Sequence, residues 1–270
     1  MALTGLQRDV CRLLAAERRR TGESYVAGGV ALSVALETNR LSRDVDVFHD
    51  TEEAVARSWD RDRVALDQAG YAVRVVRERP GYVEASVSRG NQSLTMEWAR
   101  DSAFRFFPLV EHDALGLVLH PFDLAVNKVL ALVGRAEARD WVDVIDCHER
   151  LQPLGYLAWA ACGKDPGFTP AGILEHAARS SRYTRDELAS LAFDGPAPDA
   201  ADLSQRWHAA LDGARRLIPM LPAEHAGEAV TTPAGELLSG DATALDDALR
   251  ENAVAYHRGR LGGAWPRVKG

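Results

Sequence analysis

Residues 40–48 read RLSRDVDVF, and the last five positions of this stretch alternate polar and apolar side chains. A period of two is typical of a strand, so Asp44 and Asp46 are expected on one face while Val45 and Val47 enter the core. Two neighbouring carboxylates repel each other unless a cation lies between them. The stretch therefore indicates either a site for a hard divalent cation such as Mg²⁺ or the solvated face of an edge strand.

A glycine pair lies upstream of these carboxylates. Gly28 and Gly29 follow a short predicted strand at residues 25–27 and precede a short predicted helix. The start of a helix presents free N–H groups and a positive dipole end to anions, although a glycine pair is also typical of an ordinary tight turn. The spacing to Asp44 allows one helix and a return strand beside the first. We therefore expect a phosphate cradle next to a metal site, with Ser42 as either a phosphate contact or a loop hydroxyl.

A third carboxylate would complete a two-metal arrangement. The predicted strand at residues 93–99 places Glu97 on its polar face, and this strand would lie beside Asp44. Glu97 is therefore the candidate third ligand, with surface charge as the alternative interpretation. Asp101 is the competitor, but it follows the expected end of the strand.

Lys128 is one of only three lysines among 32 basic residues. It lies within a predicted helix that begins at Pro121, and its helical neighbours are apolar, so its ammonium either extends to water or reaches into a pocket. A second predicted helix carries Arg139, Asp140 and Asp143. Arg139 and Asp143 are four residues apart and share a face, which is also compatible with a simple surface ion pair.

The 270 residues are 46% hydrophobic and 26% charged, which is the composition of a globular protein. We expect an α+β fold in which a small mixed-sheet domain (residues 1–150) precedes a helical C-terminal region (residues 151–270). Further predicted elements of the first part are a helix capped by Thr4, a helix from Thr51 to about Ala69, and strands at Tyr71–Arg77, Tyr82–Ser88 and Ser93–Ala99.

Composition narrows the possible functions and locations. The net charge of −7 means that any nucleic-acid contact must use a local basic patch. Three cysteines without a C-x-x-C pair do not indicate a disulfide framework or a zinc site. The N-terminus lacks a signal-peptide pattern, and the longest uncharged run, residues 151–163, is too short to span a membrane. We therefore expect a cytoplasmic protein with no membrane partner.

The motifs together resemble a known family. Residues 26–32 (VAGGVAL), 40–48, 123–128 and 135–143 (RAEARDWVD) are similar in order and spacing to AbiEii-type nucleotidyltransferase toxins of the DNA polymerase β-like superfamily. The related MenT toxins look similar too, and the resemblance covers roughly residues 25–150. It implies a polymerase β-like domain that moves a nucleoside monophosphate from an NTP to an acceptor hydroxyl and releases pyrophosphate. The toxins of this group attach nucleotides to the 3′ end of tRNA and are restrained by a cognate antitoxin.

The resemblance also implies roles for single residues. The first motif falls on Gly28 and Gly29, the metal pair on Asp44 and Asp46, the triphosphate contact on Lys128, and the last motif on Asp140 and Asp143. The superfamily more commonly has Gly-Ser in the first motif, so a hydroxyl is missing at Gly29.

These roles lead to a hypothesis of in-line displacement at the α-phosphorus. Mg²⁺ (or Mn²⁺) is held by Asp44 and Asp46 with Glu97, while Lys128 steadies the departing phosphates. Asp140 or Asp143 would hold Lys128 or Arg139 in place by ion pairing.

Three alternatives remain open. A small-molecule nucleotidyltransferase of the aminoglycoside-modifying kind fits the acidic balance, and a nucleotide-binding regulator without turnover fits the same fold. A glycosyltransferase that uses D-x-D is less consistent with the glycine pair and Lys128. An arginine-lined path would favour tRNA, and its expected contributors are Arg40, Arg43, Arg100, Arg105 and Arg135.

Overall fold

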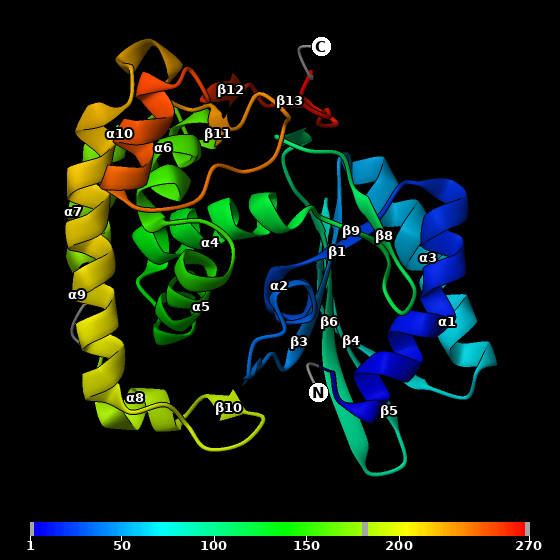
Figure 1. Cartoon of the computed structure of the whole chain (residues 1–270). Helices are drawn as coiled ribbons and strands as arrows, with labels where there is room; N and C mark the ends of the chain where they lie inside the picture. Colours follow the sequence, from blue (N-terminus) through cyan, green and yellow to red (C-terminus); the bar gives the residue numbers. More distant parts are fainter. Residues whose placement is uncertain (1–2, 180–182, 268–270) are drawn as a thin grey trace. The chain divides into compact units, whose positions relative to one another are not determined.

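The computed structural model describes residues 3–179 and 183–267, which form two compact units (Figure 1). The first unit contains the chain up to Ala103 together with Leu109–His120. The second contains Phe104–Pro108 and the chain from Pro121 onward. The helices of residues 121–150 therefore belong to the same compact unit as the C-terminal region. Their apolar faces pack against helices that follow them in the chain, which local sequence patterns do not reveal.

A mixed seven-stranded sheet is the framework of the first unit; the sequence predicts a mixed sheet but not the two short strands at residues 110–112 and 116–118. The strand order is β4-β5-β6-β3-β1-β9-β8. The strands are β1 (Tyr25–Ala27), β3 (Asp44–His49), β4 (Ala72–Arg79), β5 (Tyr82–Arg89), β6 (Gln92–Arg100), β8 (Val110–His112) and β9 (Gly116–Val118); a two-residue strand, β2 (Arg40–Leu41), precedes β3. β3 is central, because it pairs antiparallel with β1 on one side and parallel with β6 on the other.

Three helices cover the two faces of this sheet. α1 (Gly5–Thr21) begins with a capping box in which Thr4 and Gln7 bond each other's backbone, as the predicted cap requires. α1 and α3 (Glu52–Gln68) lie on one face, and α2 (Gly28–Leu36) lies on the other (Figure 1). The core between α3 and the sheet contains Trp98, whose indole N–H donates to Asp62 of α3 at 2.8 Å.

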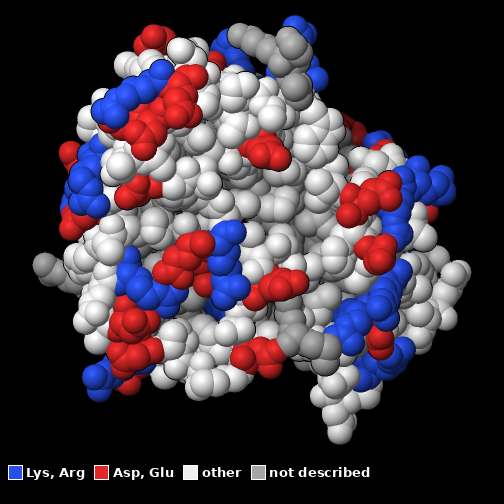
Figure 2. Space-filling model, in the orientation of Figure 1, with Lys and Arg blue, Asp and Glu red and all other residues white. Residues whose placement is uncertain are grey.

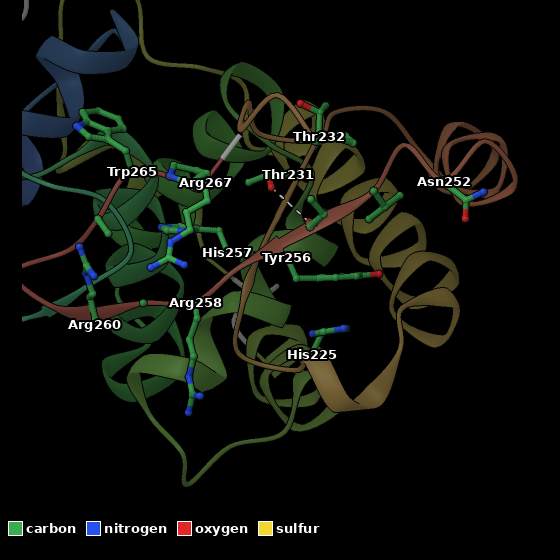
Figure 3. A pocket seen from close by; sticks show the side chains of 16 residues that line it. His225, Thr231, Thr232, Asn252, Tyr256, His257, Arg258, Arg260, Trp265 and Arg267 are labelled. Carbon is green, nitrogen blue, oxygen red and sulfur yellow. Dashed lines mark hydrogen bonds between the residues drawn. The ribbon is translucent and has the colours of Figure 1, made fainter. Parts of the chain in front are cut away.

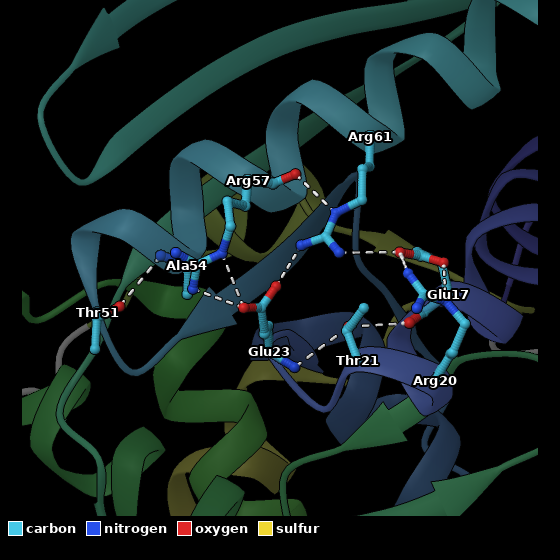
Figure 4. Close-up of polar contacts among 8 residues, drawn as sticks. All are labelled: Glu17, Arg20, Thr21, Glu23, Thr51, Ala54, Arg57 and Arg61. Atoms are coloured by element: carbon cyan, nitrogen blue, oxygen red, sulfur yellow. Dashed lines mark hydrogen bonds and ion pairs between the residues drawn. The ribbon is translucent and has the colours of Figure 1, made fainter.

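An ion-pair network ties α3 to the segment between α1 and β1 (Figure 4). Glu23 accepts hydrogen bonds from Arg57 at 2.6 and 2.9 Å and is paired with Arg61. Arg61 also reaches Glu17 near the end of α1, at 3.2 Å. The network holds the entry to β1, the strand that leads into the glycine pair.

The second unit is built around α6 (Leu154–Lys164), most of whose residues are buried. Tyr156 and Trp159 of α6 belong to an apolar cluster that includes Leu217, Val230 and Leu245. The other helices are α4 (Pro121–Arg135), α5 (Ala138–Arg150), α7 (Pro170–Arg179), α8 (Arg185–Ala189), α9 (Ala200–Leu217) and α10 (Ala242–Arg250), with 3₁₀ turns at Ile218–Met220 and Ala223–His225.

The end of the chain is less helical than the sequence pattern predicts. β11 (Ala229–Thr231) pairs with β12 (Ala255–His257), and β13 (Arg260–Leu261) pairs with β7 (Phe104–Arg105). A further two-residue strand, β10, spans Ala192–Phe193. Strands of two or three residues are too short to show a period, and their partners are distant in sequence, so periodicity does not reveal them.

Among residues 3–179 and 183–267, none of the helices has both the length and the apolar content that crossing a membrane requires.

Candidate functional site

The two aspartates of β3 lie on one face, as the alternation predicts. Val45 and Val47 have no exposed surface, whereas Asp44 and Asp46 are half-buried. β3 has neighbours on both sides, so the aspartates do not lie on an edge strand. The face that they share is the one from which α2 rises, because Asp46 is directly opposite Ala27 at the end of β1.

Gly28 lies directly against Asp46. It is the first residue of α2 and has a φ of +66°, in the left-handed region that favours glycine. A Cβ atom placed on Gly28 would overlap the carboxylate of Asp46. The carboxylate therefore lies beside the turn that starts α2, where backbone N–H groups are available to an anion.

Gly29 is crowded by two side chains of the β2–β3 segment. A Cβ atom at this position would lie 2.7 Å from the guanidinium of Arg40 and 2.7 Å from the hydroxyl oxygen of Ser42. The Ser42 hydroxyl thus occupies the space into which a side chain at position 29 would extend. Gln7 donates to the carbonyl of Ser42 at 2.8 Å and so fixes its backbone.

Glu97 lies on the strand that the sequence places beside β3. Asp46 pairs with Glu97 across β3 and β6, and Glu97 pairs with Glu84 of β5. Burial, followed by the charges of Glu97 and Glu84, raises the pKa of Tyr82 to about 12. A hydrogen bond from Tyr82 to Glu97 contributes to this shift, so the Glu97 carboxylate contacts that phenol. In the described part of the chain, no three or more His, Cys, Asp or Glu side chains form a group that could hold a metal ion.

Lys128 is buried between two carboxylates of α5. Its ammonium lies 2.8 Å from Asp143 and 3.2 Å from Asp140, and neither aspartate side chain has exposed surface. The lysine side chain is 9% exposed, so it is held inside rather than extended into water. Two carboxylates around one ammonium leave the cluster negative unless a further cation is added.

Arg135 supplies that further cation. At the end of α4 it forms a two-pronged contact with Asp140, at 2.6 and 2.9 Å. Burial raises the pKa of Asp140, but the hydrogen bond from Arg135 and the charge of Lys128 outweigh burial, and the pKa is lowered overall. Arg139 contacts Glu137 at 2.6 Å. The sequence places Arg135 in the motif at residues 135–143, but its pairing with Asp140 across the break between α4 and α5 is seen only in the fold.

The structure thus places the predicted site residues in two sets, one in each unit. The first unit brings together Gly28, Gly29, Ser42 and Asp46, with Asp44 on the same face. The second unit brings together Lys128, Asp140 and Asp143.

Two of the five arginines expected on an RNA path do not fit that expectation. Arg40 and Arg105 are 4% and 2% exposed and are therefore not available to an external polyanion. Arg40 instead lies against Gly29, a position that only the fold reveals.

Comparisons with known proteins bear on the family and the fold of the chain. The family model of the nucleotidyl transferase AbiEii toxin, of a type IV toxin–antitoxin system, matches residues 12–220. The crystal structure of JHP933 from Helicobacter pylori is similar, with a TM-score of 0.52, 14% identity, and coverage of 81% of this chain and 95% of that chain. MenT4, a nucleotidyltransferase toxin from Mycobacterium tuberculosis, gives a TM-score of 0.50 and 16% identity over 81% of this chain and 85% of that chain. Both likenesses concern the fold. No curated protein sequence matches the chain.

Proposed function

The chain belongs to the AbiEii family of nucleotidyl transferase toxins, and from that premise we propose that it moves a nucleoside monophosphate from an NTP to the 3′ end of a tRNA. The chain is a nucleotidyltransferase by family. The tRNA acceptor, the metal requirement and the restraint by a cognate antitoxin are the proposed parts. The contact between Gly28 and Asp46 carries the proposal, because it joins a phosphate-binding turn to an acidic strand.

The donor chemistry of β3 suits a hard divalent cation. Asp44 and Asp46 offer carboxylate oxygens on one face, and Mg²⁺ is usually bound by one or two carboxylates together with substrate phosphates. Bound there, Mg²⁺ or Mn²⁺ would neutralise charge on the triphosphate and activate the acceptor hydroxyl. Glu97 is the proposed third carboxylate; its side chain contacts Tyr82 in this structure and would have to turn toward Asp46 to complete a group of three ligands.

The residues around the glycine pair would hold the phosphates. The first N–H groups of α2 have no partner within the helix and are suited to oxyanions. Ser42 would supply the hydroxyl that Gly29 lacks, because its oxygen lies where a side chain at 29 would extend. Arg40, packed against the same glycine, adds positive charge beside these donors.

Lys128 is proposed to contact the triphosphate, with Asp140 and Asp143 as positioning residues. Phosphoryl transfer depends mainly on positioning and charge stabilisation, and a lysine fixed by two carboxylates loses little freedom when it binds. The family resemblance supports the role of Lys128. Arg135, which also binds Asp140, and Arg139 would complete the basic side of the cluster.

The test is to incubate the purified protein with each α-³²P-labelled NTP, Mg²⁺ and total RNA, and then to separate the products by gel electrophoresis. We expect label in RNA of tRNA size and none when EDTA is present. An RNA pool that stays unlabelled with all four NTPs would favour a small-molecule acceptor of the aminoglycoside type. Absence of both transfer and pyrophosphate release would leave only a nucleotide-binding regulator.

A further inference from the structure

A pocket of about 860 Å³ lies in the second unit, away from the Lys128 cluster in sequence (Figure 3). It is lined by the β12–β13 segment, by residues after β11 and by the last described residues. Arg258, Arg260 and Arg267 project into or around it, and no Asp or Glu is among the described residues that line it. The described lining is therefore purely basic, in a chain with a net charge of −7.

The arginines are displayed from a fixed segment. The imidazole of His257 contacts the carbonyl oxygen of Phe106 at 2.8 Å, and β13 pairs with β7. Gly259 and Gly263 pack so closely against residues 104–108 that a Cβ atom on either would overlap them. A fixed segment reduces the entropy that a ligand must overcome when it binds the arginines.

The arginines of the pocket lack carboxylate partners among the described residues, whereas His225 has one. In the described chain, none of Arg258, Arg260 and Arg267 forms an ion pair, although Arg260 donates to the carbonyl of Gly263 at 3.1 Å. The imidazole of His225, at the other end, is 3.0 Å from Glu228 and so has an acidic neighbour. On the face shown in Figure 2, basic side chains mostly adjoin acidic ones where charged groups gather.

Aromatic rings accompany the arginines. Trp265 is 60% exposed, and its ring lies tilted against that of Phe107, with the two ring centroids 6.2 Å apart. Tyr256 stacks on His225 at 4.0 Å on the opposite side of the pocket (Figure 3). Exposed aromatic rings next to arginines are the usual means by which proteins bind unpaired bases and the phosphates between them.

We propose that this pocket, which we call the C-terminal arginine pocket (Arg258, Arg260, Trp265 and Arg267), binds single-stranded RNA. Its three arginines contact successive phosphates, and Trp265 stacks on a base. Three arginines spread over residues 258–267 suit a strand with several phosphates better than a mononucleotide. The inference rests on the proposed RNA acceptor, a single-stranded stretch of which the pocket would hold. It assigns this contact to residues outside the carboxylate and lysine clusters.

The experiment measures fluorescence anisotropy of a 5′-fluorescein-labelled 12-nucleotide RNA titrated with the full chain at several salt concentrations. Three phosphate contacts predict a slope of log K against log salt of about −2. The Arg258→Ala/Arg267→Ala variant is expected to bind about tenfold more weakly and to reduce the slope to about −0.7. Trp265→Ala is expected to weaken binding on the order of tenfold, with recovery in Trp265→Phe.

Arg215→Ala is the matched control, because Arg215 is an exposed arginine of the same unit that pairs with Asp212 outside the pocket. Unchanged RNA affinity in the double arginine variant would overturn the inference, as would equal loss in the Arg215 variant. If ATP or inorganic phosphate competes as strongly as unlabelled RNA, the pocket binds anions in general, and this result would also overturn the inference. Preferential binding of an acidic peptide would do the same.

The experiments distinguish failure of the proposed function from failure of the pocket inference. If the parent protein binds the RNA through the pocket but transfers no nucleotide to RNA, the RNA acceptor is wrong and the pocket stands. If transfer to RNA is normal and the double variant has an unchanged KM for RNA, the pocket inference fails and the proposed function stands. Support for both requires a raised KM for RNA with kcat and the KM for NTP unchanged.

Discussion

The carboxylate of Asp46 lies against the α-carbon of Gly28, so closely that no side chain fits at position 28. This contact fixes the acidic strand β3 beside the turn between β1 and α2. The sheet enforces it, because Asp46 is opposite Ala27 in the β1–β3 register. Gly28 and Asp46 are 18 positions apart in the sequence, and the antiparallel pairing of β1 with β3 brings them into contact.

Gly28→Ala should abolish nucleotidyl transfer. The new methyl group would displace the Asp46 carboxylate, and the positive φ of +66° adds about 1–2 kcal/mol of backbone strain. Gly22→Ala is the control, because Gly22 has a φ of +65° with no atom near its Cβ position. Thermal unfolding and transfer are measured together. Equal transfer by the two variants would show that the Gly28 contact has no part in the reaction.

Ser42→Ala should lower transfer by about tenfold, because it removes one phosphate hydrogen bond to a charged group. Adding Gly29→Ser in the Ser42→Ala background should restore part of the rate, since both side chains extend into the same space. The readout is the KM for NTP and kcat of the single and double variants. No loss in Ser42→Ala would remove this residue from the phosphate site.

Lys128→Met should destabilise the fold by about 3–5 kcal/mol, because it removes the positive charge that pairs with the two buried carboxylates of Asp140 and Asp143. Lys128→Met/Asp143→Asn should recover part of that loss, as removal of one carboxylate reduces the repulsion. Urea unfolding of the variants measures both effects. A change below about 0.5 kcal/mol in Lys128→Met, the range of an exposed pair, would contradict the buried network.

Asp146 should make the stability of the fold decrease with rising pH, whereas an aspartate in an ordinary ion pair makes it increase. Burial, only partly offset by Arg150, raises the pKa of this carboxyl from 3.8 to about 6. A raised carboxyl pKa means that the folded protein favours the neutral form, so stability is lost as the pH rises from 3.8 to about 6 and stays at the lower level above that. Asp146→Asn should therefore raise the unfolding free energy by about 3 kcal/mol at pH 7.5 and leave it nearly unchanged at pH 3.5.

The control for this prediction is Asp212→Asn, since Asp212 is exposed. Thermal unfolding monitored by circular dichroism at the two pH values gives the comparison. A destabilised Asp146→Asn protein at pH 7.5 would show that the ionised carboxylate contributes favourably.

Local patterns suffice to predict the elements that carry the first unit. The alternation around Asp44 and Asp46 predicts β3, and Thr4 predicts the start of α1, because these signals lie within a few residues. The proximity of Gly28 to Asp46 was expected from spacing, and the sheet confirms it.

Other features depend on partners that are distant in sequence. Strands β7 and β13 have two residues each and exist because they pair with each other. A charged residue such as Arg40 is expected on the surface, yet its side chain is buried against Gly29. The two carboxylates that enclose Lys128 come from a second helix, so only the fold shows that its ammonium is buried. Composition and periodicity do not contain these pairings.

The most direct test of the account is pyrophosphate release from NTP by Asp46→Asn, with Mg²⁺ and acceptor RNA present. Asp60→Asn, on the exposed side of α3, is the matched control. Replacing one carboxylate oxygen removes a metal ligand without changing volume, so the account predicts a loss of about a thousandfold with an unchanged melting temperature, while the control keeps the parent rate. A parent-like rate in Asp46→Asn would contradict the assignment of β3 as the catalytic strand.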